Sequence, residues 1–95
     1  YFNFYIGTDL AVSTNEVSDW SVFVIGAMDE SGYLYIVDII RERMDSQEIV
    51  ETILSLQMTY NPITISMERV KLKKLLDLSF VNECSIVIFF LQFSP

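Results

Sequence analysis

The feature that most constrains this chain is an apolar run at residues 2–11 (FNFYIGTDLA) that contains one carboxylate, Asp9. Aromatic and aliphatic side chains dominate the run, which is typical of a buried strand at the centre of a sheet. A carboxylate inside such a strand costs free energy unless it is protonated, paired or bound to a cation. The sequence therefore predicts a central strand and a partner for Asp9.

Length and composition favour one globular domain over residues 1–95. The chain is 52% hydrophobic, which provides enough apolar surface to offset the entropy lost on ordering. It begins at Tyr1 without an initiator Met and stops abruptly at Pro95, so we expect an excised or incomplete piece.

The net charge of −7 disfavours general nucleic-acid binding, which normally needs a basic surface. A metal-dependent nuclease remains compatible with this charge, because its cations reverse the local sign. A single cysteine, Cys84, excludes a disulfide within the chain. No signal peptide is visible, and the apolar stretch 85–93 is shorter than the roughly 20 residues of a membrane-spanning helix. We therefore expect a protein that is neither secreted nor membrane-bound.

Two β-rich runs, 20–28 and 33–40, flank the polar turn 29–32, which ends in Gly32. This spacing predicts a hairpin, so the first three strands should form an antiparallel meander. The nearly continuous apolar character of all three strands predicts that both of their faces are covered. Trp20 and the other aromatic side chains are expected in the core.

A helix is predicted to begin after Asp45, because Asp45 and Glu48 form the D-x-x-E pattern of a capping box. It should end at Asn61, because Pro62 disfavours helical geometry in the residue before it. One apolar stripe at helical spacing is formed by Ile49, Ile53, Leu56 and Tyr60.

Residues 63–68 alternate between apolar and polar side chains and predict a fourth strand that ends in Glu68. A strand, a helix and a parallel strand need a right-handed crossover, which places the fourth strand beside the first. Glu68 then approaches Asp9, and two carboxylates at neighbouring strand ends suit a hard cation such as Mg²⁺. A second helix over 69–78 and a fifth strand over 85–91 are expected to follow.

Four of the six basic residues lie directly after Glu68. They are Arg69, Lys71, Lys73 and Lys74. We expect them either to contact nucleic-acid phosphates or to form an ordinary solvated helix face.

The order of these elements resembles the ribonuclease H-like fold, an α/β fold whose mixed sheet has antiparallel strands 1–3 and parallel strands 4–5, flanked by helices. Within that fold the chain is similar to the nuclease domain of the large terminase subunit of tailed phages. The similarity lies in four motifs, at residues 5–11 (YIGTDLA), 18–21 (SDWS), 29–35 (DESGYLY) and 63–68. It covers residues 4–78, whereas residues 79–95 are atypical of the family. The resemblance therefore implies a nuclease domain that is incomplete at its C-terminus.

This resemblance implies an endonuclease that cuts concatemeric double-stranded DNA during viral genome packaging, with two Mg²⁺ or Mn²⁺ ions held by acidic residues. Asp9 matches the first-strand acid that bridges both ions, and Glu68 matches the acid after the fourth strand. Asp19 matches an auxiliary acid at the start of the second strand. A third acid normally follows the fifth strand, and Glu83, the only carboxylate in 81–95, does not fit it convincingly.

The same resemblance implies a location and a set of partners. Terminase nucleases act in the host cytoplasm during phage assembly. Their partners are double-stranded DNA, a motor ATPase domain, the small terminase subunit and the portal.

Two other classes remain open. The first strand also resembles the phosphate-binding opening of the actin, heat-shock chaperone and sugar-kinase ATPases, which usually have Gly two residues after the Asp, where this chain has Ala11. The other class is a non-catalytic remnant or interaction module with the same fold, which the missing third acid favours.

Overall fold

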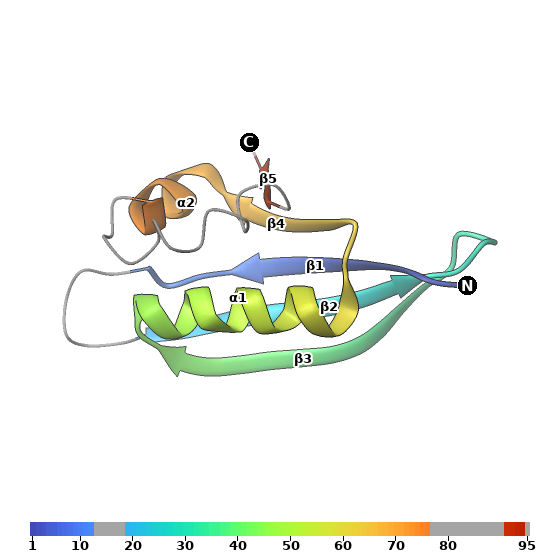
Figure 1. The fold of residues 1–95 in the computed structure, drawn as a ribbon, viewed down its shortest axis with the longest axis horizontal. Helices are drawn as coiled ribbons and strands as arrows, with labels where there is room; N and C mark the ends of the chain where they lie inside the picture. Colours follow the sequence, from blue (N-terminus) through green and yellow to red (C-terminus); the bar gives the residue numbers. More distant parts are fainter. Residues whose placement is uncertain (13–18, 77–90, 95) are drawn as a thin grey trace.

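A computed structural model describes residues 1–12, 19–76 and 91–94. The described elements are β1 (Asn3–Asp9), β2 (Asp19–Met28), β3 (Leu34–Met44), α1 (Ser46–Tyr60), β4 (Thr64–Glu68), α2 (Arg69–Leu76) and β5 (Leu91–Ser94). They form a small α/β fold, in which a mixed sheet is packed against helices (Figure 1).

Four strands of the sheet lie in the order β3-β2-β1-β4. The β1–β2 and β2–β3 pairs are antiparallel, which confirms the predicted meander. Strand β4 pairs with β1 in parallel, so the fourth strand lies beside the first, as predicted. The short β5 is parallel to β4. The predicted fifth strand at 85–91 lies, except for its last residue, outside the described residues.

The ends of α1 follow from local chemistry. Asp45 accepts a hydrogen bond from the Glu48 amide at 2.8 Å, and the Glu48 carboxylate accepts one from the Asp45 amide at 3.1 Å, which confirms the capping box. At the other end Asn61 adopts a left-handed conformation with φ 46°, and its amide donates to Gln57 O at 2.9 Å. The helix therefore begins and ends where the sequence predicts.

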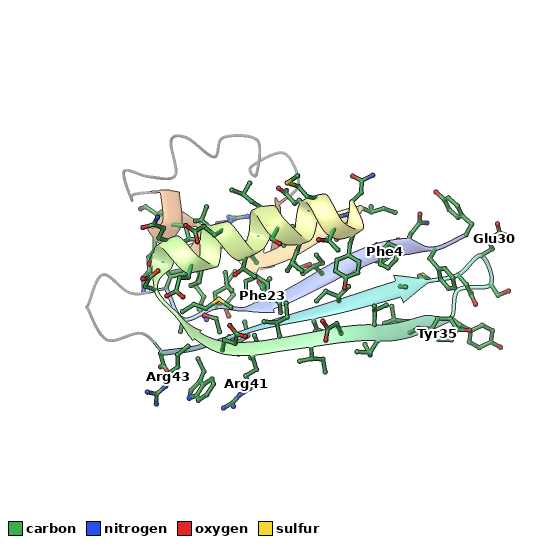
Figure 2. All side chains as sticks on the ribbon, turned by 60° about the horizontal axis from the view of Figure 1, so that its bottom comes forward. Phe4, Phe23, Glu30, Tyr35, Arg41 and Arg43 are labelled. Atoms are coloured by element: carbon green, nitrogen blue, oxygen red, sulfur yellow. The ribbon has the colours of Figure 1, made fainter. Side chains whose placement is uncertain are left out.

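The core lies between α1 and one face of the sheet (Figure 2). Ile49 and Ile53 of the predicted stripe are almost completely buried, and they pack in one cluster with side chains such as Phe23. Tyr60 is half-buried, with its ring centroid 5.3 Å from that of Phe4. Leu75 of α2 belongs to the same cluster.

The expectation that β2 and β3 are covered on both faces is wrong for the described residues. Leu34, Ile36 and Ile39 of β3 are each more than half exposed. In this part of the chain α1 lies against only one face of these strands, so their opposite side is left open (Figure 2). We call this side, which includes Val22 and Val24 of β2, the open face.

Strand β3 is longer than the sequence predicts. It continues through Arg41, Glu42 and Arg43 to Met44, whereas the prediction ended at Ile40, the last residue of the apolar run. None of the described helices is long and apolar enough to cross a membrane.

Candidate metal and nucleic-acid site

Two parallel strands bring the predicted acids to the same edge of the sheet. The β1–β4 register pairs Tyr5 with Thr64 and Gly7 with Ser66, and two residues further along each strand are Asp9 and Glu68. The Thr8 hydroxyl ties the strands together near this edge by donating to the Ser66 carbonyl. The predicted approach of Glu68 to Asp9 therefore follows from the strand pairing itself.

Both carboxylates lie on the side of the sheet opposite α1. Asp9 pairs with Val22 of the open face, and Glu68 alternates with the buried Met67. The Asp9 side chain is 83% exposed and that of Glu68 62% exposed. Both carboxylates are therefore accessible to ions and ligands in solution.

Lys71 joins the two acids. Its ammonium lies 3.2 Å from Asp9 Oδ1 and 4.0 Å from Glu68 Oε2. Because α2 follows β4 directly, Lys71 is three residues after Glu68 and reaches back over the strand end. Lys71 is therefore a cationic partner for Asp9. The expectation of a buried carboxylate at Asp9 is wrong, because the Asp9 side chain is 83% exposed at the end of β1. The expected contact of Lys71 with phosphate stays a prediction.

The chemistry of these donors suits a cation. Two exposed carboxylates already share one positive charge, and carboxylate oxygens are the ligands that Mg²⁺ and Mn²⁺ prefer. Asp9 and Glu68 could therefore hold a divalent ion in exchange for the Lys71 ammonium. No third Asp, Glu, His or Cys joins them among the residues the structure describes.

Asp19 is not brought to this pair. Its carboxylate accepts a hydrogen bond from the Trp20 amide at 2.7 Å, at the start of β2. Its role as an auxiliary ligand stays a prediction. Glu83, the acid considered for the third position, lies outside the described residues.

Ser21, the last residue of the SDWS motif, has a supporting role that the sequence did not predict. Its side chain is completely buried, and its Oγ accepts a hydrogen bond from the Ala11 amide at 3.0 Å. This bond fixes the chain directly after Asp9. The signal was present in the sequence, because a small hydroxyl residue stands in an otherwise apolar strand.

The other basic residues expected at this site lie on α2. Arg69, Lys73 and Lys74 are exposed, and Lys73 and Lys74 belong to the last turn of the helix. They lie on the helix that directly follows Glu68 in the chain. Their contact with nucleic acid stays a prediction.

A second cationic group was not predicted. The Arg41 guanidinium carbon lies 4.1 Å from the centroid of the Trp20 ring, and that of Arg43 lies 5.3 Å from it. Trp20 is 42% exposed, so its expected place in the core is wrong. The same expectation is wrong for four other aromatic side chains that are at least half exposed, namely Tyr1, Phe2, Tyr33 and Tyr35. The alternation of Arg41 and Arg43 could have revealed the group, because residues two apart in a strand share a face.

Comparison of the chain with protein-family models, with curated proteins and with solved structures finds no match. The proposal of a function therefore depends on the residues and geometry described above.

Proposed function

We propose that this chain is a ribonuclease H-like, metal-dependent endonuclease domain of the terminase type, which cuts concatemeric double-stranded DNA during viral genome packaging. The observation that supports it best is the acidic pair: Asp9 and Glu68 come from neighbouring parallel strand ends and share the Lys71 ammonium. The element order β1-β2-β3-α1-β4-α2, with β4 parallel to β1, is consistent with the resemblance.

In the proposed chemistry the cation activates water and the protein binds the cation. A divalent ion bound at Asp9 and Glu68 would lower the pKa of water and offset charge on the phosphodiester. Asp9 and Glu68 supply the negative charge that attracts the ion, and their exposure leaves room for a DNA backbone. Lys71, once exchanged for the ion, is available to a phosphate oxygen.

The ATPase alternative receives less support. It needs a backbone amide near position 11 that is free to approach phosphate, whereas the Ala11 amide already donates to Ser21 Oγ. The interaction-module alternative is favoured by one observation, the exposed aliphatic side chains of β3. The motor ATPase domain, small terminase subunit and portal are proposed partners, and the host cytoplasm is the proposed location.

The direct test is cleavage of supercoiled plasmid DNA by the purified chain in Mn²⁺ or Mg²⁺. Asp9→Asn and Glu68→Gln should each abolish metal-dependent cleavage, because each removes half of the described donor set. Each should leave the circular dichroism spectrum unchanged, because both side chains are largely exposed.

Asp38→Asn and Glu30→Gln are matched controls, because both remove an exposed carboxylate elsewhere in the fold. They should cut at the wild-type rate. A wild-type chain without metal-dependent cleavage, or an Asp9→Asn variant that cuts as fast as wild type, would contradict the proposal.

A further inference from the structure

The open face places two arginines in line with the acidic pair. Asp9 pairs with Val22 on β2, and Val22 pairs with Arg41 on β3, so these three residues form one row across the sheet. Adjacent strands are about 4.8 Å apart, which puts the Arg41 backbone about 10 Å from that of Asp9. Two residues nearer the start of β2, Trp20 pairs directly with Arg43 of β3.

Both guanidinium groups lie against the ring of Trp20. Arg41 and Arg43 each lie within cation–π distance of the Trp20 ring, and all three residues are exposed. Figure 2 shows the two arginines on the side of the sheet away from α1. Among the described residues, no carboxylate forms an ion pair with either arginine. Two like charges beside one ring repel each other, so an anion bound at this cluster would relieve an electrostatic cost that the free protein retains.

The chemistry of the group selects the anion. A guanidinium presents planar, paired N–H donors that match phosphate oxygens, and an exposed aromatic ring can also stack against a base or sugar. The chain has a net charge of −7, so this cationic cluster stands out against an acidic surface. The Arg41 backbone lies about 10 Å from that of Asp9, so a DNA backbone bound at the cluster can extend past the acidic pair.

We propose that Trp20 of β2 and Arg41 and Arg43 of β3 form a phosphate-binding site that holds the backbone of duplex DNA across the open face. The inference rests on the proposed nuclease function and names a substrate contact for it. The site is distinct from the basic residues of α2, which follow Glu68 on the other side of Asp9.

The first test measures binding of a 20-base-pair duplex in EDTA by fluorescence anisotropy at several salt concentrations. Arg41→Gln/Arg43→Gln should weaken binding and reduce the slope of log K against log salt by about 2, because two phosphate contacts are lost. Ser55→Glu/Met58→Glu is the matched control, because it changes the net charge equally at exposed positions of α1. This control should keep the wild-type slope.

The second test uses Trp20 as a reporter, because it is the only tryptophan in the chain. Duplex DNA should change the emission of Trp20 in the wild type and not in the double arginine variant. An acidic peptide of matched charge should produce a smaller change, because carboxylates on a flexible peptide do not reproduce the spacing of DNA phosphates.

The outcomes separate this inference from the proposed function. An unchanged salt slope in the arginine variant, an equal loss in the control variant, or a peptide that binds as tightly as DNA would each overturn the phosphate site. Cleavage that still depends on Asp9 and Glu68 would leave the nuclease proposal standing in those cases. A smaller slope together with a DNA-dependent Trp20 signal would support the site.

Discussion

The Lys71 ammonium holds together two carboxylates that belong to different strands. All three side chains are accessible to water, with 27% of Lys71, 83% of Asp9 and 62% of Glu68 exposed. Exposed ion pairs typically contribute only about 0.2–1 kcal/mol to stability. The importance of Lys71 is therefore that it competes with a metal ion for the same oxygen atoms.

Replacement of Lys71 with Met keeps most of the aliphatic stem and removes this competing charge. We expect Lys71→Met to bind Mn²⁺ roughly five-fold more tightly, because the ion no longer has to displace an ammonium worth up to about 1 kcal/mol. Free Mn²⁺ counted by electron paramagnetic resonance during a titration measures the affinity.

Lys74→Met is the control for this change, since Lys74 is exposed on the same helix and forms no described ion pair with either acid. It should bind Mn²⁺ close to the wild-type affinity. Equal or weaker binding by Lys71→Met, relative to wild type, would show that the ammonium does not occupy the cation position.

The placement of Asp9 and Glu68 could be predicted from the sequence because it depends only on strand order. A helix between two parallel strands places the strands side by side. Because each acid lies at the end of its strand, the two acids then come close together. The Lys71 contact could not be predicted in this way. It depends on how α2 leaves the end of β4, which no pattern of residues specifies.

At the scale of elements, the β2–β3 turn is built around one carboxylate. Asp29 Oδ1 accepts hydrogen bonds from the amides of Ser31 at 2.9 Å and Tyr33 at 3.0 Å. Its Oδ2 accepts one from the Tyr35 hydroxyl at 3.2 Å. Gly32 completes the turn with φ 88°, a conformation that a side chain would oppose. The predicted hairpin thus has a physical basis in residues 29–35.

This arrangement predicts a pH dependence. The hydrogen bond to Asp29, together with the negative charge of that carboxylate, raises the pKa of Tyr35 above its usual value near 10. Because the pKa is higher in the folded chain, this contribution to hairpin stability is fully present below the unfolded pKa and is lost as the pH rises through the folded one. Asp29→Asn should lower the pKa of Tyr35 toward its usual value.

Site-specific NMR of the Tyr35 ring measures this effect, because the chain has five tyrosines and bulk absorbance would mix them. Asp38→Asn is the control, since it removes another exposed carboxylate near the same strand pair. A Tyr35 titration that is equal in wild type and in Asp29→Asn would show that the carboxylate does not act on the phenol.

The length of β3 shows why one element was only partly predicted. Charged residues Arg41, Glu42 and Arg43 suggested that the strand ends at Ile40, because they interrupt its apolar run. The register shows that they continue to pair with β2, with Arg43 opposite Trp20. An edge strand tolerates charged side chains that a central strand would not. The sequence does not predict the arginine cluster either, because a strand that ends at Ile40 leaves out both arginines.

At the scale of the whole molecule, the described structure packs on one side only. Apolar runs in β2 and β3 suggested two covered faces, yet α1 covers one of them and leaves the other open (Figure 2). The strand sequences do not distinguish these cases, because a continuous apolar run has side chains for both faces. Only the position of a covering element decides which side chains form the core.

This asymmetry makes a comparison of two isoleucines informative. Ile25 on β2 is completely buried beneath α1, whereas Ile39 on β3 is 58% exposed on the open face. Ile25→Ala should reduce the free energy of unfolding by about 2–5 kcal/mol, because it leaves a cavity in the core. Ile39→Ala should cost less than about 1 kcal/mol, since it removes little buried surface.

Urea denaturation followed by circular dichroism measures both changes, and their chemistry is identical, so each variant is the control for the other. A cost for Ile39→Ala as large as that for Ile25→Ala would mean that the open face is covered in solution. DNA could then reach Trp20, Arg41 and Arg43 only after that cover is displaced. A small cost for Ile39→Ala leaves the route from the arginines to Asp9 open to the backbone of a duplex.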